Sequence, residues 1–456
     1  MHRTNRTIAC LLALFCCIGC EKFIKVDPPK NELTAGAVFS TDSLAQEAVT
    51  GIYIKIMSTN QCLLNGGMSV YPALSADELI RTRFIITEDQ FFTNSLLPDN
   101  YLVLFNFWRS GYATIYQTNI CLENLSRSTA IRETTKQQLT GEVKFIRALC
   151  YWYLVNLFGD VPLTTTTNVD VNATLPRAPA DQVYQLITTD LQSALSLLSD
   201  TGTNIKPTKF AAAALLARVY CYLSNWSQAE AFADSVINAG LYTLPADLNK
   251  VFLATSPETI LQFAPVLNNN STSEGLSFVP ANNSIPPTYT LTNSLLASFE
   301  PNDHRQGYWT RSVTINRQTY HHPYKYKINA SSSAATEFNV VLRLAEQYLL
   351  RAEAEAHNNK IEDAVADINT LRNRAGLASI QSNISMDSCL SVIEQEKRKE
   401  FFAEWGHRWF DLKRSTRIDT VLTINKGNAW QSTDRLYPIP LLEMQQNAYL
   451  TQNMGY

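Results

Sequence analysis

The sequence predicts a mostly α-helical protein of tetratricopeptide-like helix pairs, with an irregular, loop-rich face and a few short strands. Three observations predict this fold class. Apolar residues recur three or four positions apart over long segments, small residues flank short polar turns, and one long region interrupts the helical rhythm. The 456 residues suffice for one large body or two closely joined domains, which we place at 20–245 and 246–456.

Residues 1–19 have the features of a secretory signal peptide. Arg3 and Arg6 precede an apolar run from Ile8 to Gly19, which is shorter than the roughly 20 apolar residues of a membrane-spanning helix. We therefore predict export of the chain rather than a transmembrane helix.

Cys20 is the predicted point of attachment to a membrane. The tripeptide Ile18-Gly19-Cys20 resembles a bacterial lipobox, in which the cysteine becomes the lipid-bearing N-terminus of the mature chain. The proline-containing segment 27–30 then reads as an extended tether. The alternative is a redox or metal pair formed by Cys17 and Cys20, but no second C-x-x-C pair occurs elsewhere in the sequence.

The composition is apolar and weakly charged. Charged residues make up 17% of the chain, against roughly 25% in an average domain, and the net charge is -3. This balance gives no electrostatic argument for binding nucleic acid or an anionic membrane surface. Five cysteines follow Cys20 in apolar stretches, and we expect buried thiols, with a disulfide as the alternative. They are Cys62, Cys121, Cys150, Cys221 and Cys389.

The helices are predicted in pairs along the chain. Between Phe105 and Asp160 we expect two helices, the second of which ends at Gly159. A second pair occupies residues 211–240 and turns at Ser224-Asn225, and a third pair occupies residues 340–377. Alanine stripes at helical spacing indicate close packing between helices and carry no chemistry.

Two irregular regions interrupt these pairs. Residues 264–333 begin with a segment rich in Asn, Ser, Thr and Pro and continue with aromatic residues that alternate with polar ones, as in strands. The second irregular region spans residues 60–100. Long irregular loops inside a helical body are usually functional, so we expect the binding face in these two regions.

Several conspicuous polar groups are interpreted as structural. Glu404, Arg408 and Asp411 lie at helical spacing, so we expect their charges to pair along one helix face rather than to act in catalysis. His321 and His322 are adjacent and would point to opposite sides of a strand, which disfavours a metal site. We predict neither a metal nor a cofactor.

Nine segments of the sequence follow one another in a recognisable order. They are the lipobox, SADEL, GEVKFIRALCYWYLVNLFGDVPL, FEPNDHR, YKY, LRLAEQYLLRAEAEA, INTLRNRAGL, EFFAEWGHRWFDLKR and YPIPLLEMQQNAYLTQNMGY. In this order they resemble the SusD/RagB family of Bacteroidota surface lipoproteins over nearly the whole chain. Ala448 and Met454 replace prolines of the family's tail, and only Glu21 remains of the acidic residues that commonly follow the lipidated cysteine.

The resemblance implies a function. It implies a non-enzymatic, lipid-anchored protein on the extracellular side of the outer membrane, which captures oligosaccharide and delivers it to a SusC-like TonB-dependent transporter barrel. It also implies that the helix pairs face the transporter, that the irregular face binds ligand, and that Asp303 and Arg305 fix a loop. A RagB-like lipoprotein that captures peptide is the alternative within the family.

Aromatic and polar residues of the two irregular regions form the candidate ligand site. Sugar rings present C–H patches that lie well on aromatic faces, while their hydroxyls need polar partners at the rim. The candidates are Tyr71, Asp77, Asn282, Asn283, Tyr289, Tyr308, Trp309, Arg311 and Tyr320. Trp309 and Tyr289 are the first choices, and the alternative role of each residue is packing in the core or at a strand edge.

Two other functional classes compete with ligand capture. A secreted glycosidase needs only a sugar platform and two carboxylates. However, the sequence contains no G-x-S-x-G, H-E-x-x-H, G-x-G-x-x-G or P-loop motif, so we assign no catalytic residue. A repeat adaptor that binds only protein would instead bury the aromatic residues between Tyr308 and Tyr326.

Overall fold

The computed structural model describes residues 35–267, 270–331 and 333–456. The predicted signal peptide and the lipidation site at Cys20 lie outside these residues. The described part of the chain is mostly helical with three small sheets, as the sequence predicts. Of its helices, none combines the length and the apolar character that crossing a bilayer requires.

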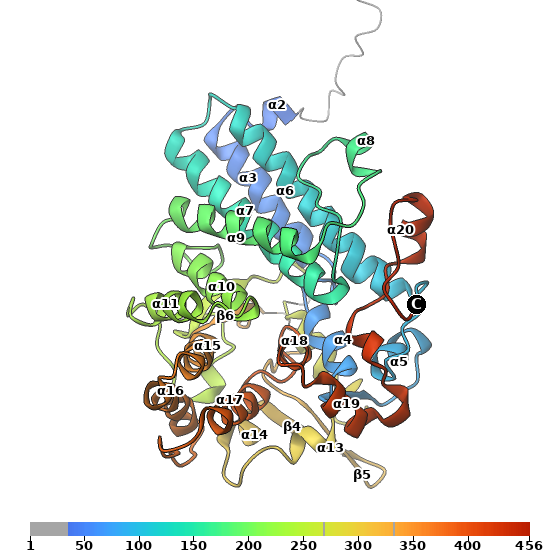
Figure 1. Ribbon diagram of the computed structural model, residues 1–456, viewed down its shortest axis with the longest axis vertical. Helices are drawn as coiled ribbons and strands as arrows, with labels where there is room; N and C mark the ends of the chain where they lie inside the picture. The colour runs from blue at the N-terminus through green and yellow to red at the C-terminus, as the bar shows by residue number, and fades with distance from the viewer. Residues whose placement is uncertain (1–34, 268–269, 332) are drawn as a thin grey trace, which may run out of the picture.

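Long helices stack against one another down one side of the molecule (Figure 1). In chain order α6 packs on α7, α7 on α9, α9 on α10, α10 on α11, α11 on α15, and α15 on α16. The three predicted helix pairs are therefore confirmed. The bounds are α3 (Asp42–Met57), α6 (Ser110–Arg127), α7 (Glu133–Phe158), α9 (Ala180–Leu197), α10 (Lys209–Tyr222), α11 (Trp226–Ile237), α15 (Leu344–His357) and α16 (Ile361–Arg374).

Local signals set the ends of these helices. The side chain of Thr208 accepts a hydrogen bond from the backbone N–H of Ala211 and caps α10, and Asn225 caps α11 in the same way. Gly159 has a φ of 71° and ends α7 at the predicted residue.

Small residues let the helices approach closely. Ala217 of α10, Ala229 and Ala233 of α11, and Ala354 of α15 form one buried cluster. The alanine stripes are thus packing surfaces, as predicted. The five cysteines between residues 62 and 389 are buried and free, which confirms the expectation of buried thiols.

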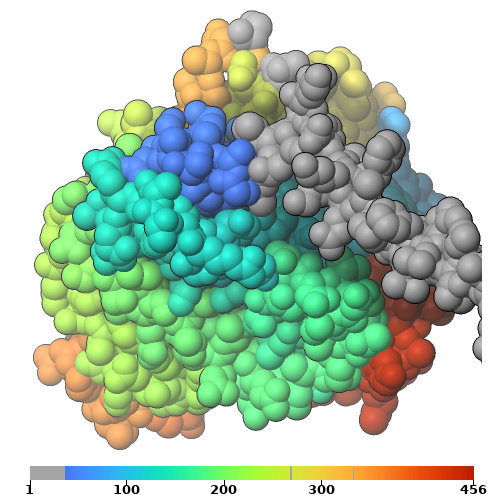
Figure 2. Space-filling model, turned by 90° about the horizontal axis from the view of Figure 1, so that it is seen from above, coloured from blue at the N-terminus to red at the C-terminus, as the bar shows by residue number. Residues whose placement is uncertain are grey.

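Shorter elements surround the stack. The helices are α2 (Ala35–Val38), α4 (Gly67–Ser75), α5 (Ile86–Phe92), η2 (Val103–Arg109), α8 (Val169–Asn172), η3 (Leu248–Lys250), α12 (Ser273–Phe278), α13 (Asn293–Leu296), α14 (His304–Trp309), α17 (Met386–Glu400), α18 (His407–Arg414), α19 (Ile418–Lys426), η4 (Gly427–Ala429), η5 (Ser432–Arg435) and α20 (Leu441–Gln446). Figure 2 shows the molecule from the end that carries α2 and α3, where α6, α7 and α9 cover much of the near face.

The strands form three separate antiparallel pairs. These are β1 (Leu79–Arg81) with β3 (Tyr289–Leu291), β2 (Thr259–Phe263) with β6 (Asn339–Arg343), and β4 (Thr310–Ile315) with β5 (Gln318–Pro323). The β4–β5 hairpin lies at the end of the molecule opposite α2 and α3 (Figure 1).

The expectation that Glu404, Arg408 and Asp411 pair along one helix face is wrong. The chain leaves the helix after α17 and starts a new one at α18, so Glu404 lies outside the helix that carries Arg408 and Asp411. Glu404 accepts from Arg343 at 3.0 Å, and Arg408 donates to Asp77 at 2.8 Å, while Asp411 bonds an arginine of its own helix. Their structural role is confirmed, but it joins distant segments.

Asp303 and Arg305 fix the loop before α14, as the resemblance implied. Asp303 accepts from the Arg305 backbone N–H at 3.0 Å and from its guanidinium at 2.7 Å. The same guanidinium reaches Glu396 at 2.9 Å, and all three side chains are buried. The loop that leads into β4 is therefore held against α17.

Candidate functional site

The loop-rich face forms where the two irregular regions meet. β1 pairs with β3, with Ile80 opposite Thr290. Beyond β1, Thr82 donates its backbone N–H to the carbonyl of Thr288 at 3.1 Å and its hydroxyl to the carbonyl of Pro287 at 2.7 Å. β3 in turn packs against β5. Segments about 200 residues apart in the sequence thus form one surface, at the end of the molecule that carries β4 and β5 (Figure 1).

A polar hollow of about 300 Å³ opens on this face. It lies between the segment 279–283 and the β4–β5 hairpin, and three of the predicted residues line it: Asn282, Asn283 and Arg311. The remaining lining residues are Val279, Pro280, Ala281, Val313, His322, Tyr324 and Lys327.

One face of the hairpin is turned toward this hollow. Arg311 lies opposite His322 in the register, and Val313 lies opposite Tyr320. Directly opposite residues of an antiparallel pair carry their side chains on the same face. The predicted residue Tyr320, which is half-buried, therefore shares the face of the three residues that line the hollow.

The strand-like alternation of aromatic residues from Tyr308 to Tyr326 is confirmed only in part. Tyr320 lies in β5, whereas Tyr308 and Trp309 lie in α14, and Tyr324 and Tyr326 follow β5.

His322 supplies an unused hydrogen-bond acceptor. Its side chain is 1% exposed, and its Nδ1 lies 3.0 Å from the carbonyl oxygen of Pro323. Because that oxygen only accepts, we assign the ring proton to Nδ1, which leaves Nε2 as an acceptor. Within the described residues Nε2 has no partner. Burial lowers the pKa of His322 and the nearby charge of Arg311 lowers it further, so the ring is neutral at pH 7.

Arg311 and Lys327 are the charged groups of the hollow. Arg311 donates to the hydroxyl of Tyr324 at 2.8 Å, and its guanidinium carbon lies 5.0 Å from the centroid of that ring. The ammonium of Lys327 bonds Asn249 and lies 5.4 Å from the same centroid. Burial lowers the pKa of Lys327, although the carboxylate of Glu337 opposes this shift. The lining residues include no Asp or Glu.

The two first-choice aromatic residues lie in the core. Trp309 is 0% exposed and donates its indole N–H to the carbonyl of Leu248 at 3.1 Å. Tyr289 is 1% exposed and donates its hydroxyl to Glu88 at 2.7 Å. Neither ring offers a free face to a sugar, so both take the alternative role of packing.

Two further predicted residues are also buried. The hydroxyl of Tyr71 donates to Gln61 at 3.0 Å. Asp77 accepts from Arg408 at 2.8 Å and from Arg398 at 2.7 Å. Although burial alone raises the pKa of Asp77, these two guanidinium groups hold it below its ordinary value. Asp77 therefore serves as a structural anchor.

The ninth predicted residue stands apart from the hollow. Tyr308 is exposed on α14 and packs edge-on against His304, with the ring centroids 6.4 Å apart. It remains a surface aromatic residue without a place in the hollow.

The sequence analysis did not predict seven of the lining residues, and three of these seven carry polar side-chain groups: His322, Tyr324 and Lys327. His322 was weighed only as a metal ligand. Tyr320, His322 and Tyr324 follow one another at a spacing of two residues, and side chains at this spacing in an extended chain point to the same side. This spacing is the signal that could have identified His322 and Tyr324. Among the described residues, no group of three or more His, Cys, Asp or Glu side chains is arranged to hold a metal ion.

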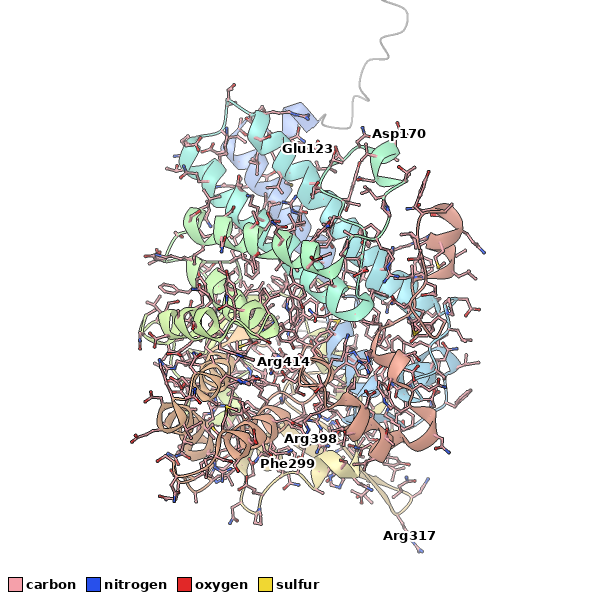
Figure 3. The ribbon with its side chains drawn as sticks, in the orientation of Figure 1. Glu123, Asp170, Phe299, Arg317, Arg398 and Arg414 are labelled. Carbon is pink, nitrogen blue, oxygen red and sulfur yellow. The ribbon has the colours of Figure 1, made fainter. Side chains whose placement is uncertain are left out.

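A larger cavity, of about 430 Å³, lies between α10, α11, α15, α17 and α18. Its inner wall is a cluster of ion pairs, in which Glu353 accepts from Arg414 at 2.5 Å and from Lys397 at 2.5 Å. Arg414 lies at this junction of helices in Figure 3, well away from Arg317 at the tip of the hairpin. These charges satisfy one another, and none of the nine predicted site residues lines this cavity.

Comparisons with known proteins agree with this architecture. Residues 39–221 match a SusD-like family described as starch-binding and associating with the outer membrane, and residues 266–456 match the SusD family. The chain is 26% identical to SusD-like protein P25 of Formosa agariphila, with 100% of both chains covered. It is 23% identical to the starch-binding protein SusD of Bacteroides thetaiotaomicron, covering 76% of this chain and 77% of that one.

Solved structures share the fold. A SusD superfamily protein from Bacteroides vulgatus gives a TM-score of 0.81 at 22% identity and covers 91% of this chain and 99% of its own. A laminarin-binding SusD-like protein gives a TM-score of 0.76 at 21% identity, with the same coverage.

Proposed function

The chain belongs to the SusD/RagB family of Bacteroidota, and from this premise we propose that it is a lipid-anchored, cell-surface glycan-binding protein. It captures oligosaccharide and passes it to a SusC-like TonB-dependent transporter in the outer membrane. Its role is capture and not catalysis. The outer-membrane association in the description of the matched family and the laminarin bound by a protein of the same fold support this proposal.

The observation that carries the proposal is a hollow lined by the amides of Asn282 and Asn283 and by His322, whose Nε2 has no partner within the described residues. A sugar hydroxyl both donates and accepts hydrogen bonds. Nε2 accepts from one hydroxyl, while an amide and the Arg311 guanidinium donate to others. A buried acceptor without a partner costs free energy until a ligand satisfies it, so a bound hydroxyl recovers that cost.

Aromatic surface completes the site. Tyr320 is half-buried on the hairpin face that borders the hollow, so part of its ring remains open to the C–H patches of a sugar, whereas Arg311 and Lys327 lie over the ring of Tyr324. The platform is therefore assigned to Tyr320 and not to Trp309 and Tyr289.

The test is binding of the full chain to a panel of plant, host and microbial glycans, measured by calorimetry. We expect a glycan whose affinity falls about three- to tenfold in His322→Leu and in Asn283→Ala, as loss of one hydrogen bond predicts. Arg127→Ala on α6 is the control, since that arginine is exposed at the opposite end of the molecule, one turn from Glu123 (Figure 3). The thermal midpoint of each variant verifies its fold.

Other outcomes reassign the function. Binding of peptides with no glycan bound would favour peptide capture by a RagB-like protein. Turnover of a labelled glycan by the purified chain would establish a glycosidase. If the chain is isolated from native outer membranes without a barrel protein, the transporter partnership is contradicted.

A further inference from the structure

The hollow on the loop-rich face is lined by two basic residues, Arg311 and Lys327, and by no Asp or Glu, although the chain as a whole carries a net charge of -3. Four more basic residues lie in the segments around the hollow. They are Arg81, Arg83, Arg317 and Lys325. A surface with one sign of charge attracts ligands of the opposite sign.

Four of these six positive charges are not neutralised by an ion pair. Arg81 pairs with Glu88 at 3.0 Å, and Lys325 is buried in an ion pair with Glu404. The other four make no ion pair within the described part of the chain, and all except the half-buried Lys327 are exposed. Arg317 stands at the outer tip of the hairpin in Figure 3.

Arg311 is the free cation best placed to bind a ligand. Its contact with Tyr324 uses one guanidinium nitrogen and holds the group at the wall of the hollow. The other guanidinium N–H groups make no hydrogen bond to the described residues. A planar guanidinium with free N–H groups matches the paired oxygens of a carboxylate or a sulfate.

We infer that the hollow takes a saccharide that carries a negative charge, either a uronate carboxylate or a sulfate ester, and that Arg311 recognises this charge. This inference rests on the proposed function and narrows its ligand class. His322 and the two asparagines bind hydroxyls of the same sugar, while Lys327 adds positive potential inside the hollow. Arg83 and Arg317 add potential outside it and speed the approach of an anionic chain.

Matched pairs of probes test the inference. The first pair is an oligogalacturonide and the same oligosaccharide with its carboxyl groups reduced to alcohols. The second pair is a sulfated carrageenan oligosaccharide and its desulfated product. We expect the full chain to bind the acidic member of at least one pair about fivefold or more tightly than its neutral partner in about 50 mM NaCl. The difference shrinks in about 500 mM NaCl because salt screens the charges.

Variants assign the effect to Arg311. Arg311→Gln removes the charge at an exposed position, and we expect it to abolish the preference for the acidic member of the pair over its neutral partner. Arg127→Gln, at an exposed site on α6, is the matched control and keeps the preference. The thermal midpoints of both variants verify that they are folded.

Each outcome decides a separate point. If both members of each pair bind equally, the charge preference is overturned and the proposed glycan capture stands. A preference that persists in Arg311→Gln overturns the role of Arg311. If none of the probes and no glycan of the panel binds, capture and charge preference fall together. If a polyglutamate peptide displaces the acidic saccharide at equal concentration, saccharide recognition is contradicted.

Discussion

At the scale of single residues, the buried carboxyl group of Glu78 is unusual because it forms no ion pair within the described residues. Its Oε2 accepts from the backbone N–H of Ala403 at 3.3 Å, and its Oε1 has no partner within the described residues. Burial, together with the negative charge of Asp77, raises the pKa of Glu78 to about 8. The folded protein therefore holds a proton that the unfolded chain releases near pH 4.5.

The sign of the resulting pH dependence follows from linkage. Between about pH 4.5 and 8 the unfolded state binds fewer protons than the folded state at this site, so the site loses stability as the pH rises. In Glu78→Gln this titration is absent. We expect the variant to gain free energy of unfolding relative to the parent as the pH rises through this window, by at most about 1.4 kcal/mol per pH unit.

The measurement is urea unfolding of both proteins at pH 5 and pH 8. The exposed Glu362→Gln on α16 is the control, and its difference from the parent should not depend on pH. An equal difference at both pH values for Glu78→Gln would show that the carboxyl group is not protonated in the folded protein.

Residue type alone predicted only part of the site. Asn282, Asn283 and Arg311 are predicted as polar partners of a sugar in an irregular region, and Tyr320 is predicted for its aromatic ring. Trp309 and Tyr289 were chosen for their aromatic rings. Their burial depends on contacts with Leu248 and Glu88, which lie 61 and 201 residues away and leave no local signal.

At the scale of elements, helical periodicity predicted the stacked pairs because each helix buries one face against its neighbours in the chain. It failed between α17 and α18. There Ala403 and Trp405 have positive φ angles of 52° and 46°, and the indole of Trp405 donates to the carbonyl of Val340 at 2.6 Å. Tertiary contacts impose this turn on residues that also suit a helix, so spacing alone did not reveal the break.

The end of α16 offers a test of how elements are joined. Gly376 follows this helix with a φ of 77°, and the backbone N–H of His304 donates to the carbonyl of Ala375 at 2.9 Å. A Cβ at residue 376 would lie 2.5 Å from the imidazole of His304, which begins α14. We expect Gly376→Ala to lower the free energy of unfolding by about 1–3 kcal/mol, because it combines a left-handed backbone with a clash.

Gly307 is the matched control for this prediction. It lies within α14, and a Cβ there would meet nothing within 4 Å. Gly307→Ala should be neutral or slightly stabilising in the same urea titration. Equal effects of the two substitutions would contradict the proposed contact between α16 and α14.

At the scale of the whole molecule, a single core joins the two proposed domains. One buried apolar cluster contains residues from Phe39 to Leu450 and includes side chains from both sides of the division at 245/246. The C-terminal segment also bonds the N-terminal half, where the backbone N–H of Tyr437 donates to the carbonyl of Leu157 at 2.8 Å. The sequence predicted the helix pairs, but it did not indicate how closely the two halves are joined, because contacts so distant in sequence have no periodic signature.

The continuity of this core predicts that neither half folds alone. Arg218 of α10 forms an ion pair with Glu346 of α15 at 2.5 Å, and both side chains are buried. In a fragment of residues 20–245 this arginine loses its partner, which costs about 3–5 kcal/mol if the charge stays buried. The fragment also exposes apolar side chains that the other half covers.

We expect the full chain to unfold in one urea transition, whereas fragments 20–245 and 246–456 each lack a cooperative transition. A mixture of the two fragments should recover part of the native circular dichroism, since their interface is the core itself. A cooperative transition in either isolated fragment would instead identify an independent domain and contradict the single core.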